Sequence, residues 1–381
     1  RHQALLYTGV ARIARLAGVP VVYYAVGAGP IETALGRWLI RDSANRAAFV
    51  SVRDRESRDL LKAIGVHRPV AVVADPAFGL AAPPATTGEM THRSTGEMTH
   101  GSTGRQTDGT TGRGTDAAAG GMKAETGGLL PPRRPGVLRV GISAMPCYYP
   151  GLASDGDPAR YAAYVEGMRT LTRGLLAMEV PTAVEVVYFG TKYPQDVETA
   201  KEILADMEVA MITGGGKPLT GSPPVTGDGA ENGAADGPNE PRRRVWVLDR
   251  ELEPQDLITL MGELDMLIAT RLHALILATV AGTPSIGIAY RSKVQAIFSD
   301  NGREHWIVSP EEADWPAQLL GLWREMAGQL DAERQAVRQM AEANRQAVRE
   351  QVLALSRWVR TARPEDMATN STADNTEGGK K

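Results

Sequence analysis

The chain has 381 residues, of which 43% are hydrophobic, and its formal net charge is −3. This length allows more than one hydrophobic core, and the charge offers no global basic field of the kind that attracts nucleic acid. A single cysteine, Cys147, excludes a disulfide framework and a multi-cysteine zinc site. The longest apolar run, Ala274 to Ala281, is far too short to span a bilayer, and no signal peptide is visible.

The first 83 residues alternate between helical and strand patterns. Apolar residues recur at helical spacing over 3–17, 34–47 and 56–64. Three runs are typical of buried strands: Val21–Val26, Phe49–Val52 and Val70–Ala74. Strands that alternate with helices predict a parallel sheet with crossover connections. Because the chain begins with Arg1 and a helical pattern starts at once, we expect this lobe to be truncated, with a first strand or a signal lost.

Two inserts and a tail have compositions that cannot bury a core. Residues 84–134 contain an octapeptide repeat (TTGEMTHR, STGEMTHG, STGRQTDG), and residues 214–242 are rich in Gly, Pro and Asp. We expect both to be disordered, together with the polar tail 363–381. His92 and His100 recur within the repeat, but no fixed geometry favours a metal there, and we predict no metal site.

Between and after the inserts the α/β rhythm returns. Strands are predicted over 137–143, 184–189, 245–248, 266–269 and 285–289, and helices over 160–178, 195–207, 254–262 and 330–360. The sequence therefore predicts an α/β fold with two Rossmann-like lobes. Its expected parts are an N-terminal lobe (1–83), a disordered linker (84–134), a C-terminal lobe (135–325), a C-terminal helix (326–362) and the tail.

Polar residues follow several of these strands, at the edge where doubly wound sheets bind ligands. Arg53, Asp75, Arg271 and His273 come just after predicted strands, so we expect them to face one cleft between the lobes. Arg271 and His273 would lie in the first turn of a helix capped by Thr270. A helix N-terminus disfavours cations, and two of them there indicate a bound anion.

Each of these residues also has a structural interpretation. Arg271 could pair with Asp265, and His273 could be a satisfied helix residue. Lys293, which opens the helix after the last predicted strand, could be a solvated surface lysine. In the sequence Arg53-Asp54-Arg55-Glu56-Ser57, Asp54 could simply cap a helix. The Gly27-Ala28-Gly29-Pro30 segment is either a phosphate-binding loop or a plain tight turn.

Four motifs taken together are more specific than any one of them. They are VGAGP, SVRDRESRDLL, ADPAF and ATRLHALILATVAGTPSIGIAYRSKV. In this order they resemble the polysaccharide pyruvyl transferase family, over most of 5–83 and 137–300. The most specific part is the RLH triplet followed by AGTP and by a lysine twenty residues after the histidine. The resemblance implies two Rossmann-like lobes similar to the B-type glycosyltransferase fold.

The same resemblance implies transfer of a pyruvyl group from phosphoenolpyruvate to two hydroxyls of a sugar in a cell-wall or extracellular polysaccharide. The products would be a ketal and free phosphate. Arg53, His273 and Lys293 match the family's phosphoenolpyruvate-binding and catalytic positions, with Arg271 beside them, and His273 is the expected acid/base. Three further residues are expected to line the cleft: Gly27, Gly29 and Asp75.

The expected partners are phosphoenolpyruvate as donor and a polysaccharide or lipid-linked glycan as acceptor, with no cofactor and no nucleic acid. Arginine forks and a lysine can neutralise the donor's phosphate and carboxylate without a metal. The expected location is the cytoplasm, and peripheral association with the inner face of the membrane is kept open.

The chain departs from the family in several places, so two alternatives remain. The family's usual N-terminal glycine-rich region is not present, both inserts are unusual, and ISAMPCYYP (142–150) lacks the arginine that many members carry. The first alternative is a nucleotide-sugar glycosyltransferase or epimerase of the same fold, although no carboxylate lies between Ala269 and Ile288 to hold a ribose. The second is a truncated, non-catalytic glycan-binding relative.

Overall fold

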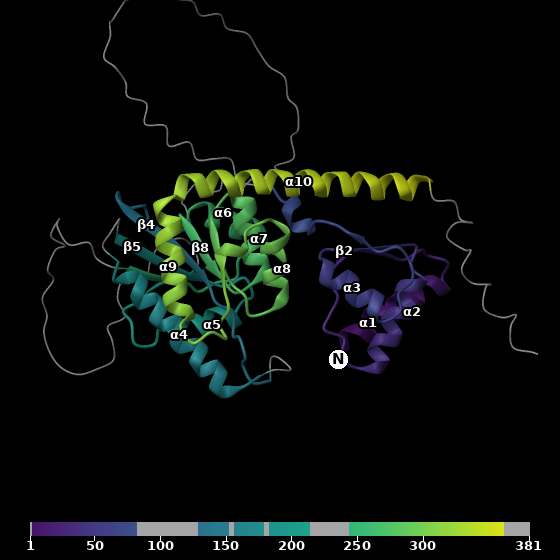
Figure 1. Ribbon diagram of the computed structural model, residues 1–381, viewed down its shortest axis with the longest axis horizontal. Helices are drawn as coiled ribbons and strands as arrows, with labels where there is room; N and C mark the ends of the chain where they lie inside the picture. The colour runs from purple at the N-terminus through teal and green to yellow at the C-terminus, as the bar shows by residue number, and fades with distance from the viewer. Residues whose placement is uncertain (1, 82–128, 152–155, 179–182, 214–243, 362–381) are drawn as a thin grey trace, which may run out of the picture.

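A computed structural model describes residues 2–81, 129–151, 156–178, 183–213 and 244–361. The predicted insert 214–242 and the tail 363–381 lie outside these residues, as does nearly all of the predicted linker 84–134. The described parts form two α/β lobes with parallel sheets, and one long helix runs along both of them (Figure 1). Among these residues, no helix combines the length and the apolar character needed to cross a membrane.

The N-terminal lobe contains a three-stranded parallel sheet in the order β1-β2-β3. Its elements are α1 (His2–Leu16), β1 (Val22–Val26), α2 (Ala34–Asn45), β2 (Phe49–Val52), α3 (Arg55–Ala63), β3 (Ala71–Val72) and the 3₁₀ helix η1 (Pro76–Gly79). The alternation matches the sequence pattern. A small cluster forms its core: Ala44, Ala47, Val50, Val52, Leu61 and Val66.

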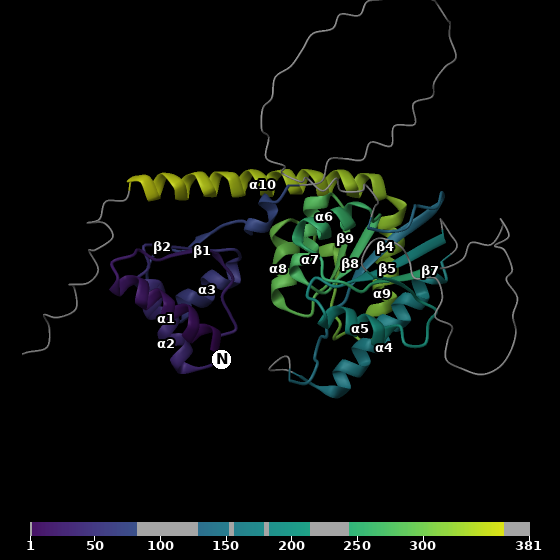
Figure 2. The ribbon, with the colours of Figure 1, turned by 180° about the vertical axis from the view of Figure 1, so that it is seen from behind.

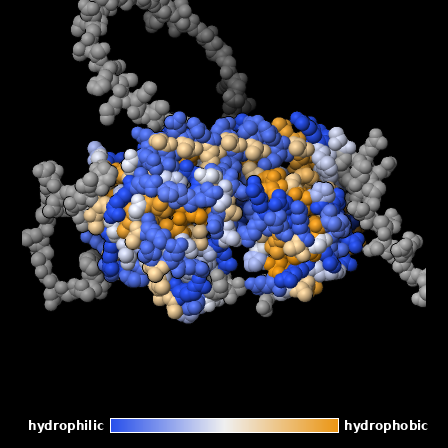
Figure 3. All heavy atoms as spheres, in the orientation of Figure 1, coloured by the Kyte–Doolittle hydropathy of each residue, from blue (hydrophilic) through white to orange (hydrophobic). Residues whose placement is uncertain are grey.

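Helix α1 packs against the rest of the lobe through small residues, and its Thr8 and Ala11 are buried. Its large apolar side chains, among them Leu6, Ile13 and Leu16, are 63%, 68% and 82% exposed. Hydrophobic residues accordingly reach the surface of the N-terminal lobe (Figure 3).

The junction between β2 and α3 has the capping arrangement that the sequence predicts. The Asp54 carboxylate accepts a hydrogen bond of 2.6 Å from the backbone N–H of Ser57, and Gly65 follows the helix with a φ of +93°. Arg53 is therefore the one residue between the end of β2 at Val52 and the cap of α3 at Asp54.

The C-terminal lobe is a seven-stranded parallel sheet in the order β10-β9-β8-β4-β5-β7-β6 (Figure 2). Its strands are β4 (Val137–Ser143), β5 (Ala183–Phe189), β6 (Ala210–Ile212), β7 (Arg244–Leu248), β8 (Met266–Ala269), β9 (Ser285–Ile288) and β10 (Ile307–Val308). Its helices are α4 (Pro158–Leu176), α5 (Gln195–Ile203), α6 (Pro254–Gly262), α7 (Leu272–Ala281), α8 (Ser292–Asp300), η2 (Glu304–Trp306) and α9 (Trp315–Gly328).

The strand order places a topological switch point between β4 and β8. From β4 the chain builds the sheet outward through β5, then returns to the other side of β4 to add β8, β9 and β10. Connections leave the two central strands in opposite directions, which opens a crevice beyond their carboxyl ends. Strands β8 and β9 are buried along their whole length, as parallel strands covered on both faces are.

Helix α10 (Leu330–Thr361) connects the two lobes. Near its start, Arg334 bonds to Asp265, which also accepts hydrogen bonds from Arg133 (2.9 Å) and from the backbone N–H of Arg139 (2.8 Å). Asp265 is therefore a structural carboxylate. It does not pair with Arg271, so the structural interpretation that paired these two residues is wrong.

Further along, α10 contacts the N-terminal lobe. The Trp358 ring lies 6.2 Å from the ring of Phe49, and the Tyr24 hydroxyl donates to Gln351 over 3.5 Å. Both lobes are thus held on one rigid element, which limits the range of relative positions open to them.

We predict that Asp265→Asn destabilises the fold by about 2 kcal/mol, because a buried carboxylate that accepts three charged or backbone donors loses its charge. Urea unfolding measures this change. Asp331→Asn is the matched control, since Asp331 pairs with the same Arg334 but its side chain is 99% exposed. The control should change stability by less than about 0.5 kcal/mol. Equal effects of the two variants would contradict the role of Asp265.

Candidate functional site

Three of the residues singled out in the sequence lie together where the lobes meet. Arg53 Nη1 donates a hydrogen bond of 2.8 Å to Asp75 Oδ2, and the same nitrogen lies 3.3 Å from His273 Nε2. His273 Nε2 is 4.0 Å from Asp75 Oδ2. The other oxygen of Asp75 caps η1 by accepting from the backbone N–H of Ala77 at 3.0 Å. Arg53 and Asp75 come from the first lobe and His273 comes from the second.

The position of Arg53 depends on Gly27. A Cβ atom on Gly27 would stand 2.9 Å from Arg53 Nε, so the guanidinium lies directly against this backbone. Arg53 Nε is buried and has no hydrogen-bond partner among the described residues. An arginine has five N–H donors, and a buried donor without a partner costs free energy. The guanidinium is therefore only partly satisfied by Asp75 and retains donor capacity for an anion.

Lys293 reaches across to the N-terminal lobe. Its Nζ donates to the backbone carbonyl of Gly29 over 3.3 Å. Desolvation by burial lowers the pKa of Lys293, with Arg53 and Arg291 adding repulsion and Asp54 opposing the shift. A lysine in this setting is not a solvated surface residue, because protein atoms replace part of its hydration shell.

The beginning of α8 also contacts the beginning of α3. Ser292 Oγ donates to both oxygens of Glu56, at 2.9 and 2.7 Å, and Arg55 pairs with Asp300 at 3.6 Å. Glu56 therefore bonds to the other lobe and does not act only within its own helix. These contacts hold Lys293 close to the Gly27–Gly29 turn.

Arg271 is engaged by a carboxylate that the sequence analysis missed. Its Nε and Nη2 donate to Asp196 Oδ2 and Oδ1 at 2.7 and 2.5 Å, a bidentate pair. The Asp196 side chain is fully buried and also accepts from the backbone N–H groups of Thr191 and Lys192. The only signal for Asp196 was its position in the first turn of a helix that follows a strand.

Thr270 is not the cap of α7, contrary to our prediction. The helix begins one residue later, with Arg271 in the cap position and no side-chain cap. The Thr270 hydroxyl instead accepts from the Met145 N–H (2.9 Å) and donates to the Ser143 carbonyl (3.2 Å). It therefore ties the carboxyl end of β8 to that of β4, which fixes the direction in which Arg271 and His273 leave the sheet.

The surroundings of His273 favour its neutral form. Its pKa is lowered, first by desolvation and then by the charges of Arg53 and Arg271, while Asp75 acts in the opposite direction. The side chain remains 57% exposed, so a ligand can reach it. Since arginine can only donate, the contact with Arg53 makes Nε2 the acceptor, which assigns the proton of the neutral ring to Nδ1.

The described residues contain no group of three His, Cys, Asp or Glu side chains placed to hold a metal ion. What the seam between the lobes does contain is a set of partly desolvated cations next to one imidazole. Such a set can bind an anion and move a proton close to it.

The resemblance implies phosphoenolpyruvate as the ligand, and on that expectation we predict that Gly27→Ala weakens its binding about tenfold or more, equal to about 1.4 kcal/mol, because the new methyl group displaces the Arg53 guanidinium. Isothermal titration calorimetry measures the affinity. Gly9→Ala is the matched control, since nothing lies within 4 Å of a Cβ at that position. Wild-type affinity in Gly27→Ala would show that Arg53 does not contact the anion.

Comparison with solved structures shows the fold. A UDP-forming α,α-trehalose-phosphate synthase from Burkholderia xenovorans matches with a TM-score of 0.51 and 14% identity, over 93% of this chain and 72% of that one. A putative UDP-N-acetylglucosamine 2-epimerase from Listeria monocytogenes matches with a TM-score of 0.44 and 12% identity, over 93% and 71%.

A third structure, of EarP-mediated arginine glycosylation of elongation factor EF-P, matches with a TM-score of 0.36 and 14% identity, over 61% of this chain and 63% of that one. The comparison with curated proteins finds no match. The first of these likenesses shows that the two lobes have the B-type glycosyltransferase arrangement expected from the sequence.

Comparison with protein families gives the classification. The family described as polysaccharide pyruvyl transferase matches residues 2–111 and 195–292, which together make up more than half of the chain. The matched segments contain Arg53, Asp75, Asp196, Arg271 and His273, and Lys293 follows directly. The site thus lies within the matched segments and at their edge, and the chain belongs to the polysaccharide pyruvyl transferase family.

Proposed function

We propose that this protein transfers the pyruvyl group of phosphoenolpyruvate to two hydroxyls of one sugar unit, with a polysaccharide or lipid-linked glycan as acceptor. Family membership and fold support the broader statement that it is a polysaccharide-modifying transferase. The observation that carries the finer proposal is the meeting of Arg53, His273 and Lys293, from two lobes, around an incompletely satisfied guanidinium.

The charges of the site suit this donor. Phosphoenolpyruvate carries a phosphate and a carboxylate, which need several fixed cations. Two of the cations are held by carboxylates, Arg53 by Asp75 and Arg271 by Asp196. Such pairs keep the guanidinium groups oriented, so little reorganisation is needed when an anion binds. Lys293 adds a compact charge, and its lowered pKa reflects a site from which water is partly excluded.

The proposed reaction balances with these residues alone. A proton is added to the methylene carbon of phosphoenolpyruvate, which becomes a methyl group and leaves an oxocarbenium-like centre at C2. One sugar hydroxyl attacks C2, and the second displaces the phosphate to close the ketal. The two sugar hydroxyls together lose two protons. One of them replaces the proton that was added to the methylene carbon, and the other leaves with the phosphate. His273 is the group that gives and receives these protons.

A direct test is incubation of the protein with phosphoenolpyruvate and a set of cell-wall, exopolysaccharide and lipid-linked glycans. The proposal predicts one phosphate released for each glycan that gains the mass of a pyruvyl ketal. Parallel incubations with nucleotide sugars test the alternative of the same fold. Transfer from a nucleotide sugar, with phosphoenolpyruvate left intact, would replace the proposal by that alternative.

We predict that His273→Ala lowers turnover by about 10²–10⁴-fold, the usual loss when a general acid–base group is removed. Its affinity for phosphoenolpyruvate should stay within about threefold of wild type, because arginine and lysine provide the binding charges. Steady-state kinetics and calorimetry measure the two quantities. Near-normal turnover in the variant would make His273 a structural residue.

The pH dependence should carry the signature of the same histidine. As an acid, His273 must be protonated, so the rate falls as the pH rises through its pKa. In the free protein that pKa is lowered by desolvation and by neighbouring cations, whereas bound phosphoenolpyruvate adds negative charge and raises it. The limb in kcat/KM should therefore lie at lower pH than the limb in kcat. Both limbs should be lost in His273→Ala, and their persistence would assign them to another group.

A further inference from the structure

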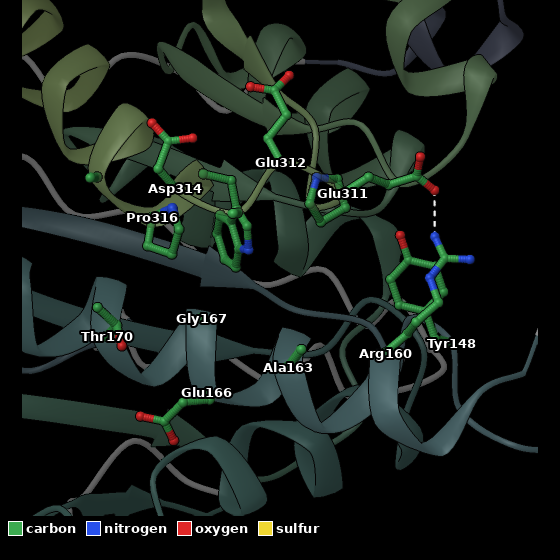
Figure 4. A pocket seen from close by; sticks show the side chains of 14 residues that line it. Tyr148, Arg160, Ala163, Glu166, Gly167, Thr170, Glu311, Glu312, Asp314 and Pro316 are labelled. Atoms are coloured by element: carbon green, nitrogen blue, oxygen red, sulfur yellow. Dashed lines mark hydrogen bonds and ion pairs between the residues drawn. The ribbon is translucent and has the colours of Figure 1, made fainter.

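A cavity of about 740 Å³ lies in the C-terminal lobe, between α4 and the segment that leads from β10 into α9 (Figure 4). Its volume is in the range of pockets that hold organic ligands. The floor is formed by one face of α4, with Ala163, Glu166 and Thr170 in line, and the opposite wall by residues 310–317. Tyr148 and Arg160 close one end of the cavity.

Tyr148 presents an unsatisfied polar group to this cavity. The residue is 3% exposed, and its hydroxyl has no hydrogen-bond partner among the described residues. The Arg160 guanidinium lies over the ring face, 4.0 Å from the centroid, and the Tyr290 ring meets it edge-on at 4.9 Å. Both flanking groups contact the ring, and a buried hydroxyl without a hydrogen-bond partner costs free energy.

Burial also raises the pKa of Tyr148, so the hydroxyl keeps its proton and can both donate and accept. Figure 4 shows its oxygen turned toward the side of the cavity where Glu311 lies. Tyr148 itself has a φ of +61°, an uncommon conformation for a bulky residue. A hydroxyl-bearing ligand in the cavity would supply the missing partner.

The charges around the cavity select among such ligands. Four carboxylates line it, those of Glu166, Glu311, Glu312 and Asp314. Arg160 pairs with Glu311 at 2.5 Å and Arg169 pairs with Glu166 at 2.6 Å, so the carboxylates still outnumber the cations that pair with them. Carboxylates are strong acceptors for hydroxyl donors. The excess of negative charge repels an anion, so the cavity suits a neutral polyhydroxylated molecule, which is the chemistry of an uncharged saccharide.

The cavity is connected to the candidate site through the loop after β4. Cys147, next to Tyr148, lies close enough to Arg271 for that cation to act on the pKa of its thiol. Tyr290, which packs on Tyr148, lies in the segment between β9 and α8, three residues before Lys293. Tyr148, which lines one end of the cavity, thus has neighbours that precede or approach the cations Lys293 and Arg271.

We propose that this cavity binds the neutral sugar units next to the one that reacts, and so holds the acceptor glycan. The inference rests on the proposed pyruvyl transfer. Transfer adds a carboxylate to a sugar that had none, so the acidic rim should disfavour a chain whose neighbouring unit is already pyruvylated. The cavity then serves both acceptor binding and the exclusion of modified chain from the position beside the site.

The test uses two surface substitutions on the same helix. Ala163→Trp fills the cavity, and Ala162→Trp places the same side chain one residue away, on an exposed position that does not line it. The probes are cellotriose and chitotriose as neutral trisaccharides and trigalacturonate as the anionic one. Binding is measured by saturation-transfer NMR and calorimetry without phosphoenolpyruvate, so that no turnover is needed.

At least one neutral trisaccharide should bind wild type and Ala162→Trp alike and bind Ala163→Trp about tenfold more weakly, a loss of about 1.4 kcal/mol. Trigalacturonate should bind more weakly than the neutral probes, and Glu166→Gln with Glu312→Gln should narrow that gap. No binding of either neutral probe, equal binding by the two tryptophan variants, or a preference for trigalacturonate would overturn the proposal.

Phosphate release from phosphoenolpyruvate, assayed separately, distinguishes this inference from the proposed function. Saccharide binding that Ala163→Trp abolishes, without any turnover of phosphoenolpyruvate, would leave the saccharide subsite standing and reject the pyruvyl transfer. Turnover of phosphoenolpyruvate with an acceptor KM that is the same in both tryptophan variants would support the pyruvyl transfer and reject the saccharide subsite.

Discussion

The contact of Arg53 with Asp75 and His273 is the interaction on which the rest of the site depends. It joins the ends of β2, η1 and α7, which belong to different lobes, within 4.0 Å. The Arg53–Asp75 pair is mostly buried, with 20% and 9% of the two side chains exposed, so its attraction is offset by lost hydration. A pair of this kind adds little net stability, but it holds a charged group in a defined orientation.

Several independent features of the chain maintain that orientation. Asp54 caps α3 directly after Arg53, and Gly27 makes room for the Arg53 guanidinium. The Asp75 carboxylate, which accepts from Arg53, also caps η1. On the other side, Asp196 fixes Arg271 and Thr270 ties β8 to β4. Helix α10 spans both lobes, so the two halves of the site are joined by a rigid element as well as by direct contacts. Preorganised charge of this sort is what anion binding and proton transfer need.

Much of the fold could be predicted because parallel strands covered on both faces are continuous apolar runs. Strands β4 and β8 have the predicted bounds for this reason. Strands β6 and β10 were missed because they are three and two residues long and carry no period. Helix α9 was also missed, although the buried residues Leu319, Trp323 and Met326 repeat at helical spacing.

The site could be predicted only as a set of positions after strands. That rule, with the family motifs, selected Arg53, Asp75 and His273, which the structure brings together. It could not select Asp196, which lies 75 residues from Arg271 in sequence, or identify Asp265 as a partner of Arg334. Pairing of distant charged residues is decided by the register of the sheet and by helix packing, and neither leaves a local pattern. The position of Tyr148 beside a cavity depends on the same tertiary information.

We propose that cations from both lobes bind one phosphoenolpyruvate molecule. The most direct measurement is calorimetric titration of phosphoenolpyruvate into wild type, Arg53→Gln and Lys293→Gln, at one fixed ionic strength. Each substitution, although made in a different lobe, is expected to weaken binding by about tenfold or more, or about 1.4 kcal/mol. Unchanged affinity in either variant would contradict this proposal, because it would show that the two lobes do not share the anion.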